Sequence, residues 1–343
     1  MPSSPNRCPD RRGHKTGSPV ELHSTFSLAL IYIRSMAEIM YGQPVAEEIE
    51  RKVQIAVDSL KTSHQVVPRL DVILVGKSPA SERYVKRKLD TCQGLGMRAE
   101  LHTFNHDVTA RELRDHVLSL SADPSVHGIL VQLPLPRPIE EPADDTTLDK
   151  FDIFDAIAAE KDVDGVSRYS IAELYRAQQN RLRFLPATAV AIRRMLAYYH
   201  IETEGRKAVV VGRNDITAKP VHHMLGGRMC NATAIWCHRH TRQQDHDAFM
   251  READIIVTSV GSERYKLTGN IVKPGAVVID VGTRVGADGR LQGDVDFESV
   301  APVASQITPV PKGVGPVTVA ALTENVVRAA QFAVGIRKSG YIF

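Results

Sequence analysis

Short runs of β-branched and other apolar residues alternate with amphipathic helical stretches along most of this 343-residue chain. Residues 70–76 and 128–133 are continuous apolar runs of strand length, which is typical of strands buried on both faces. Strands that alternate with helices predict a parallel sheet covered by helices, so we expect an α/β protein. In chain order, this first series comprises helix 47–60, strand 70–76, helix 81–95, strand 98–104, helix 110–120 and strand 128–133.

A second series of the same kind follows in the other half of the chain. A helix over residues 189–199, just after Pro186, separates the two series and is the expected connector between two domains. A last amphipathic helix is expected over residues 318–333. The second series comprises strand 207–211, a helix through 221–225, and strands 232–237, 254–258 and 276–280.

The charge of the chain is unevenly distributed. The whole sequence has 43 Lys and Arg against 40 Asp and Glu, a net charge of +3. Residues 1–35 hold five basic and two acidic groups, so the other 308 residues carry 38 of each sign. Nucleic-acid-binding domains are usually net basic, so we expect no nucleic-acid partner. We also expect no membrane association, because the longest apolar run, residues 26–33, is too short to span a bilayer.

Residues 1–35 form an extension rich in Pro, Ser, Arg and Gly, without helical or strand periodicity. An Arg-rich segment poor in acidic residues fits a mitochondrial transit peptide. The same composition fits a disordered tail, which is our expectation, or an upstream start with the working chain beginning at Met36 or Met40. Four cysteines without a CxxC pair favour a reducing compartment. We therefore expect a cytoplasmic protein, or a mitochondrial one if the extension is a transit peptide.

The turn after strand 207–211 has features of a nucleotide site. Gly212 allows close approach of a phosphate to the backbone, and a helix N-terminus follows, although no GxGxxG motif is present. NAD sites usually place an acidic residue at the end of the next strand, whereas this chain has Arg239 and Arg242 there. Together with Arg213, these arginines predict recognition of the 2′-phosphate of NADP. The alternative is that they are solvated loop charges.

The helix after strand 70–76 carries a candidate catalytic lysine. Ser78 fits an N-cap and Pro79 the first helical position. Tyr84 and Lys88 are then four residues apart and share one helix face, near the carboxyl end of a parallel strand where α/β proteins bind ligands. A lysine whose pKa is lowered by burial can act as a general acid or base. The alternative is an ordinary surface pair.

Other features are interpreted without catalytic roles. Residues 137–150 are acidic and contain proline, so we expect a solvated loop. Cys92 is expected to be an inert buried thiol on the lysine helix. A group of His and Cys residues matches no closed zinc-ligand spacing, so we expect no metal site. That group comprises His222, His223, Cys230, Cys237, His238, His240 and His246.

Seven segments, in this order and spacing, resemble the bifunctional methylenetetrahydrofolate dehydrogenase/cyclohydrolase family across nearly all of residues 40–335. The resemblance implies oxidation of 5,10-methylenetetrahydrofolate by NADP⁺ to the methenyl cation. It also implies hydrolysis of that cation to 10-formyltetrahydrofolate, a step of one-carbon metabolism that serves purine biosynthesis. The segments are the helix with Ser81, Tyr84 and Lys88, then 128–136 (GILVQLPLP), 161–165 (KDVDG), 212–220, 273–282 (KPGAVVIDVG), 293–297 (GDVDF) and 308–318 (TPVPKGVGPVT).

The resemblance also implies roles for individual residues. Lys88 would be the catalytic lysine, and Gln132 would hydrogen-bond it and help set its protonation. Tyr84 would stack on the folate, and Asp164 would bind the amino and ring N–H groups of the pterin. The expected folate-binding residues are Tyr84, Lys88, Gln132, Leu133, Asp164, Gly313, Gly315 and Pro316. The expected NADP-binding residues are Thr188, Gly212, Arg213, Asn214, Ile216, Pro220, His238, Arg239, Arg242, Val260, Gly261, Asp280, Gly282 and Thr318.

The chain departs from the family pattern at a few positions. Asn214 stands where serine is usual, Ala218 where glycine is usual, and Lys312 also replaces a glycine. Residues 186–189 (PATA) stand where the family generally has Pro-Cys-Thr-Pro, and an insertion is expected around residues 144–152. None of these departures alters a residue matched to catalysis.

The resemblance further implies the domain organisation. A folate-binding catalytic domain would comprise residues 36–187 plus 312–343, with the C-terminal helix returning to it. A Rossmann-type NADP-binding domain would comprise residues 188–311, and the protein would be a homodimer. Three alternatives are weaker: a dehydrogenase without cyclohydrolase activity, a non-catalytic folate-binding relative, and a generic Rossmann dehydrogenase of the shikimate type. Each leaves Tyr84, Lys88, Gln132 and Asp164 partly unexplained.

Overall fold

The computed structural model describes residues 36–142, 144, 147–176, 184–286 and 289–336. The predicted extension over residues 1–35 lies outside these ranges. Among the described helices, none is both long and apolar enough to cross a membrane.

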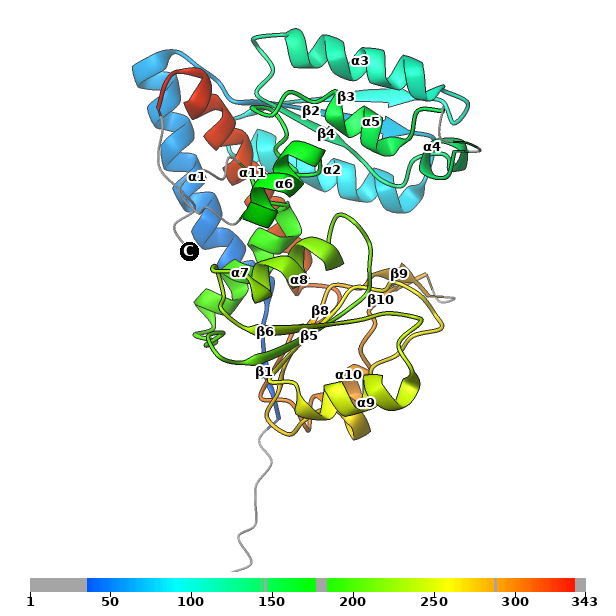
Figure 1. Cartoon of the computed structure of the whole chain (residues 1–343). Helices are drawn as coiled ribbons and strands as arrows, with labels where there is room; N and C mark the ends of the chain where they lie inside the picture. Colours follow the sequence, from blue (N-terminus) through cyan, green and yellow to red (C-terminus); the bar gives the residue numbers. More distant parts are fainter. Residues whose placement is uncertain (1–35, 143, 145–146, 177–183, 287–288, 337–343) are drawn as a thin grey trace, which may run out of the picture. The chain divides into compact units, whose positions relative to one another are not determined.

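The first half of the chain builds a three-stranded parallel sheet in the order β3-β2-β4 (Figure 1). The strands are β2 (Arg69–Val75), β3 (Arg98–Phe104) and β4 (Gly128–Val131). Helices α2 (Pro79–Gly94) and α3 (Ala110–Ala122) connect them. β2 is the central strand and almost wholly buried, which explains its continuous apolar run.

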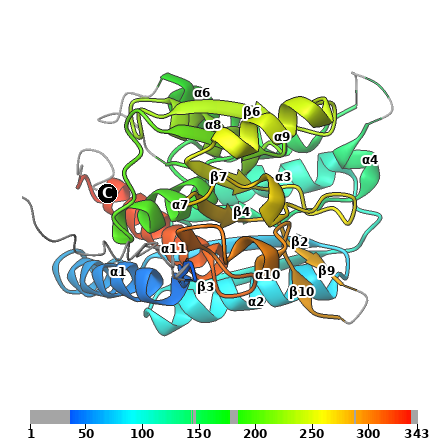
Figure 2. The ribbon, with the colours of Figure 1, turned by 90° about the horizontal axis from the view of Figure 1, so that it is seen from below.

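Three further helices pack against one another: α1 (Gly42–His64), α7 (Ala187–Tyr198) and α11 (Val314–Ala333). α1 and α11 pack side by side in both ribbon views (Figures 1 and 2). Asn325 of α11 donates hydrogen bonds to the carbonyls of Val163, at 2.7 Å, and Leu185. The C-terminal helix therefore returns to the first half of the chain, as the sequence predicts.

The second half builds a six-stranded parallel sheet in the order β1-β11-β8-β7-β5-β6. Residues 38–39, at the start of the described chain, form its edge strand β1. Helices α8 (Ala218–Gly226) and α9 (Gln243–Glu252) follow β5 and β6. The strands are β1 (Glu38–Ile39), β5 (Lys207–Val211), β6 (Thr233–Cys237), β7 (Ile255–Thr258), β8 (Val277–Asp280) and β11 (Gln306–Ile307).

One cluster of buried apolar side chains runs through both halves. It contains Val72 of β2, Ile192 of α7, Val210 of β5 and Val317 of α11. The predicted connector helix α7 is thus buried on most of its surface, with Val190, Ile192 and Met195 fully covered. Burial of this apolar surface holds the two halves together.

The prediction of a solvated loop over residues 137–150 is wrong at its two ends, whereas the described residues 141, 142, 144 and 147–149 form no helix or strand and are at least partly exposed. Residues Arg137–Glu140 form the short helix α4, which buries Ile139, and Lys150 opens the helix α5 (Lys150–Asp155). Asp149 caps α5 by accepting hydrogen bonds from the backbone N–H groups of Phe151 and Asp152. Helices this short carry too few residues to show a period, so the sequence did not predict them.

Several other elements also went unpredicted. The helix α6 (Arg168–Arg176) and α9 are mostly exposed, and the strands β9 and β10 have two residues each. The remaining small elements are η1 (Gly269–Ile271), β9 (Arg284–Val285), β10 (Leu291–Gln292) and α10 (Phe297–Val300).

Candidate active site

Lys88 and Gln132 meet at the carboxyl end of the first sheet. Ser78 caps α2 by accepting from the backbone N–H of Ser81, and Pro79 occupies its first turn, as predicted. The Nζ of Lys88 donates to Oε1 of Gln132 at 3.0 Å. The Nε2 of Gln132 donates to the carbonyl of Leu133 at 2.8 Å, which turns the amide oxygen toward the lysine. The predicted hydrogen bond between Lys88 and Gln132 is therefore present.

Burial tunes the ionisable groups at this point. Burial lowers the pKa of the Lys88 ammonium, and the nearby charge of the Asp164 carboxylate partly opposes that shift. Burial also raises the pKa of the Asp164 carboxyl to about 6, with Lys88 opposing the rise. Lys88 and Asp164 thus sit in one desolvated electrostatic environment. Cys92 is fully buried and desolvation raises its pKa to about 12, which agrees with the inert thiol expected there.

Asp162, which the sequence did not single out, fixes the turn that carries Asp164. Its buried carboxylate accepts from the backbone N–H groups of Val166 and Ser167 and from the hydroxyl of Ser170, at 2.6–3.1 Å. Gly165 follows at φ +66°, a backbone conformation that favours glycine. The sequence contained a pattern that could have indicated this turn, because residues 161–165 (KDVDG) combine acidic residues with a glycine.

The predicted folate-binding residues Gly313, Gly315 and Pro316 lie at the N-terminus of α11. Gly313 takes the N-cap position, and a Cβ there would lie 2.5 Å from the carbonyl oxygen of Pro309. A Cβ at Gly315 would meet nothing within 4 Å, so this position faces open space. Lys312 has φ +82°, a left-handed conformation that glycine adopts more easily. Pro316 is buried in the first turn of α11.

The turn after β5 is shaped by Gly212 and Asn214. Gly212 has φ +126°, and a Cβ there would lie 2.1 Å from the carbonyl oxygen of Ser259, so only glycine fits. The Oδ1 of Asn214 accepts from the backbone N–H groups of Thr217, at 2.8 Å, and Ala218, at 3.0 Å. Its Nδ2 donates to the Ser259 carbonyl and hydroxyl. Asn214 thus binds the backbone amides at the start of α8 and joins the turn to Ser259, which follows β7.

A cavity of about 520 Å³ brings residues of the two halves together. Leu133, from the end of β4, shares it with Lys150, whose Nζ forms an ion pair of 2.7 Å with Glu140. These two charged residues belong to the region predicted as a solvated loop, and the sequence did not indicate their position. The cavity is lined by Leu133, Pro134, Glu140, Lys150, Asn214, Asp215, Ile216, Thr217, Ser259, Val260, Gly261, Val281, Gly282 and Thr283.

A second cavity, of about 790 Å³, adjoins the same turns of the second sheet. Arg213, His238 and Arg239 line it as predicted for the nucleotide, together with Gly212, Asn214 and Val260. Arg264 and Lys266 also line it, from the loop after β7. They lie more than 50 residues from Arg213 in the chain, and no local pattern links them to it.

Arg242 and Asp280 do not line these two cavities. The guanidinium of Arg242 donates to Asp245 at 2.7 Å on the exposed surface of α9. Asp280 is only 3% exposed, and burial raises the pKa of its carboxyl to about 6. Asp280 accepts from the hydroxyl of Thr258 and the backbone N–H of Gly282. Asp280 therefore holds the turn at Gly282 through buried hydrogen bonds. The family resemblance had instead suggested that Asp280 contacts the cofactor.

The remaining predicted cofactor residues lie on helices. Thr188 is partly exposed in the first turn of α7. Thr318 donates its hydroxyl to the carbonyl of Val314 within α11. Pro220 lies in α8 and lines a separate apolar cavity of about 850 Å³ with Trp236. The structure therefore does not bring these three side chains to either nucleotide cavity.

The histidines and cysteines of the predicted non-metal group have other partners. His222 stacks on Trp236 and His223 on Tyr175, while Cys230 and Cys237 are free buried thiols. Within the described part of the chain, three metal-compatible ligand atoms converge only at Asp71, Glu100 and His102. The guanidinium of Arg69 already binds both carboxylate oxygens of Asp71, at 2.8 and 2.9 Å, so positive charge occupies that position.

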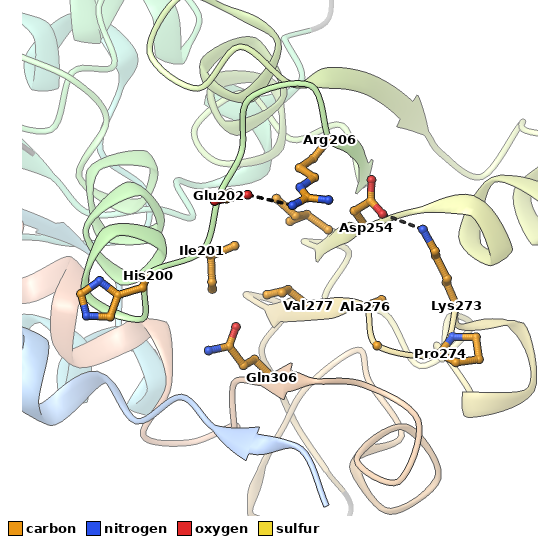
Figure 3. Close-up of a pocket in the computed structure, with 12 residues that line it drawn as sticks. His200, Ile201, Glu202, Arg206, Asp254, Lys273, Pro274, Ala276, Val277 and Gln306 are labelled. Carbon is orange, nitrogen blue, oxygen red and sulfur yellow. Dashed lines mark hydrogen bonds and ion pairs between the residues drawn. The ribbon is translucent and has the colours of Figure 1, made fainter. Parts of the chain in front are cut away.

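A further cavity, of about 500 Å³, lies at the amino ends of strands of the second sheet (Figure 3). Arg206, Asp254 and Ala276, which line it, come just before β5, β7 and β8. Its charges are paired, with Lys273 Nζ 2.6 Å from Asp254 Oδ1 (Figure 3). Ligands in α/β proteins bind at the carboxyl ends of the strands, so this amino-end cavity is not the candidate site.

Comparison with known proteins gives a consistent result over both halves. A family model described as the catalytic domain of tetrahydrofolate dehydrogenase/cyclohydrolase matches residues 40–164. The model of the family's NAD(P)-binding domain matches residues 186–334. The bifunctional protein FolD of Dechloromonas aromatica is 40% identical over 300 residues, which cover 88% of this chain and 99% of that protein.

Two solved structures are similar over the same region. The bifunctional FolD methylenetetrahydrofolate dehydrogenase/cyclohydrolase from Campylobacter jejuni has a TM-score of 0.78 and 36% identity, covering 86% of this chain and 99% of that one. The N5,N10-methylenetetrahydrofolate dehydrogenase-cyclohydrolase of Trypanosoma brucei, solved with NADP and an inhibitor, has a TM-score of 0.79 and 32% identity. It covers 88% of this chain and 99% of that one.

Proposed function

Because this chain belongs to the tetrahydrofolate dehydrogenase/cyclohydrolase family, we propose that Lys88, Gln132 and Asp164 form the centre of its two reactions. The enzyme oxidises 5,10-methylenetetrahydrofolate to 5,10-methenyltetrahydrofolate with NADP⁺ and hydrolyses that product to 10-formyltetrahydrofolate. The observation that carries the proposed centre is the 3.0 Å hydrogen bond between Lys88 and Gln132 in the desolvated environment shared with Asp164.

Lys88 is the proposed general base for hydrolysis. Burial lowers its pKa, so a larger fraction of its amine is neutral near pH 7 than for an exposed lysine. A neutral amine does not repel the positively charged methenyl group and accepts the proton of the attacking water. Gln132 contributes by fixing the Nζ atom through its Oε1 acceptor. Because this hydrogen bond uses an N–H of the neutral amine, the lone pair of Nζ stays available to accept a proton.

Asp164 and Tyr84 are the proposed folate-binding side chains beside the lysine. A carboxylate accepts hydrogen bonds from the amino and ring N–H groups of a pterin, and Asp164 is ionised above its pKa of about 6. Tyr84 lies one helical turn before Lys88 on α2, and on this basis its ring is proposed to stack on the bound folate. Gly313, Gly315 and Pro316 are proposed to form the opposite wall.

NADP is proposed to bind in the two cavities at the carboxyl ends of the strands of the second sheet. Gly212 admits the backbone close to a phosphate, and Arg213 and Arg239 supply positive charge for the 2′-phosphate, with Arg264 and Lys266 on the facing loop. NADP⁺, when bound, supplies the hydride acceptor. The turns with Asn214, Ile216, Val260, Gly261 and Gly282 are proposed to hold the rest of the cofactor near Leu133.

We propose the domain organisation that the sequence suggests, with residues 36–187 plus 312–343 for folate and 188–311 for NADP. Glu38–Ile39 are the exception, because β1 pairs with β11 in the sheet of the NADP domain. We also propose a homodimer. Support comes from β6, an edge strand with the uncharged sequence TAIWC, in which Trp236 is 38% exposed. Natural proteins usually cover or charge such edges. A measured mass of one chain by light scattering, at micromolar concentration, would contradict the dimer.

The proposed location is the cytoplasm, with the mitochondrion as the alternative if residues 1–35 act as a transit peptide. The described cysteines Cys92, Cys230 and Cys237 are free thiols, which agrees with a reducing compartment. Cell fractionation of the full chain with a C-terminal tag separates the two locations.

The proposed centre is tested by replacing Lys88 with methionine in the full chain. K88M keeps the length of the side chain but removes the amine, so hydrolysis of methenyltetrahydrofolate should fall at least about a hundredfold. The matched control is K86M on the same helix, since Lys86 is exposed and pairs only with Asp90. Retention of cyclohydrolase activity in K88M, or equal loss in K86M, would remove Lys88 from its role.

A further inference from the structure

Two buried carboxylates lie together beneath the turns that line the cofactor cavities. Asp280 ends β8, and Asp294 follows β10; both are almost completely buried. Oδ1 of Asp280 accepts from the backbone N–H of Asp294 at 3.1 Å, and Oδ2 accepts from the N–H of Val295 at 2.9 Å. Asp280 therefore holds the segment that carries Asp294 in place.

Asp294 in turn binds the turn after β7. Its Oδ2 accepts from the backbone N–H of Val260 at 2.6 Å, and its Oδ1 accepts from that of Gly261 at 2.9 Å. Two successive amides bound by one carboxylate fix the direction of a turn, because charge-assisted hydrogen bonds are short and strong. Val260 lines both nucleotide cavities, and Gly261 lines the smaller one. Asp294 itself lines neither.

The fit around Asp294 leaves no room for rearrangement. A Cβ at Gly282 would lie 1.9 Å from Oδ2 of Asp294, and a Cβ at Gly293 would lie 2.0 Å from Oδ2 of Asp280. Both glycines are therefore required where the carboxylates pass the backbone. Since Gly282 also lines the smaller cavity, the same carboxylate determines the spacing of two cofactor-facing turns.

We propose that Asp294 is a positioning residue for NADP, which acts by holding the Val260–Gly261 turn against the cofactor without touching it. This inference rests on the proposed function. The dehydrogenase step needs the turn in place, whereas hydrolysis of methenyltetrahydrofolate consumes no nucleotide. The two activities of one protein therefore separate an effect on cofactor placement from a general loss of structure.

The test is D294N in the full chain. The substitution keeps the shape of the side chain but turns an N–H group toward one of the two amide donors, so a hydrogen bond is lost and that amide is left unsatisfied. The KM for NADP⁺ should rise about tenfold or more, and the dissociation constant for NADPH should rise in parallel. Cyclohydrolase activity, assayed without nucleotide, should stay within about twofold.

D296N is the matched control, since Asp296 lies two residues further along and its backbone N–H bonds Leu267. Both activities of D296N should stay within about twofold of those of the unmodified protein. An unchanged KM for NADP⁺ in D294N overturns the inference, and so does an equal loss of both activities. If the unmodified chain has neither activity, the proposed function fails instead.

G282A provides a second route if D294N does not fold. The added methyl group must displace the Asp294 carboxylate, so the same selective rise in the KM for NADP⁺ is expected. A G282A protein with an unchanged KM overturns the inference.

Discussion

The amide of Gln132 holds the amine of Lys88 at 3.0 Å while its other end is anchored to the Leu133 carbonyl, so the lysine always meets the amide oxygen. The oxygen is neutral and leaves the burial-lowered pKa of Lys88 largely intact. An anionic partner at the same place would reverse that effect, because an opposite charge favours the ammonium form. The charge of the side chain at position 132 is therefore expected to influence the pKa of Lys88 and, through it, the pH range in which hydrolysis is fast.

Replacing Gln132 with glutamate should move the acidic limb of the cyclohydrolase pH–rate profile to higher pH. The new carboxylate raises the pKa of Lys88, so more alkaline conditions are needed to obtain the neutral amine. The measurement is the rate of methenyltetrahydrofolate hydrolysis between pH 6 and 10. Q93E, on the exposed part of α2, adds the same charge and should leave the profile in place. A profile of Q132E that overlays that of the unmodified enzyme would contradict this assignment.

The arginines after β6 should differ in their effect on cofactor choice. R239A removes positive charge from the nucleotide cavity, so the KM for NADP⁺ should rise about tenfold while that for NAD⁺ changes little. R264A is expected to act in the same direction. R242A is the built-in control, because Arg242 pairs with Asp245 outside the cavity. The measurement is the KM for NADP⁺ and for NAD⁺ from steady-state kinetics of each variant. A larger rise in the KM for NADP⁺ in R242A than in R239A would contradict the proposal that Arg239, and not Arg242, binds the 2′-phosphate.

Folate binding should weaken below about pH 6. Burial raises the pKa of the Asp164 carboxyl to about 6, so its carboxylate is lost as the pH falls through that value. Because the folded state takes up this proton more readily than the unfolded chain, the desolvated carboxylate opposes folding above pH 6. D164N should therefore unfold at the same temperature as the unmodified protein or above it, yet bind folate about tenfold more weakly. Calorimetry at pH 7 measures the unfolding temperature, and titration with folate at pH 7 measures the affinity. A D164N protein with a lower unfolding temperature and unchanged folate affinity would contradict both expectations.

Lys312 should be a site where glycine stabilises the protein. Its φ of +82° is costly for a residue with a Cβ, and glycine removes that cost. K312G should raise the free energy of unfolding by about 1 kcal/mol in a denaturant titration. K77G, at an exposed loop position without a positive φ, should be neutral or destabilising, because glycine adds entropy to the unfolded chain. Destabilisation by K312G would show that the lysine side chain outweighs the backbone strain.

Most of the fold could be read from local periodicity. The strands β5, β7 and β8 and the helices α2, α3 and α7 lie within a few residues of their predicted positions, because each buries one apolar run or stripe. The short helices α4 and α5 could not be read in this way. They are held by the cap at Asp149 and by the burial of Ile139, and neither leaves a period in the sequence.

The sequence by itself determined the α/β architecture, because strands and helices leave regular apolar spacings along the chain. Its resemblance to the family then implied the pairing of Lys88 with Gln132, which the structure contains. Only the tertiary structure decided which charges line the cavity that we propose for the nucleotide. It placed Arg264 and Lys266 in the cavity, turned Arg242 toward Asp245 and buried Asp280 beneath the turns. The physical reason is that the positions of these side chains depend on how loops from separate parts of the chain pack together at the carboxyl ends of the strands. A local sequence pattern carries no information about that packing.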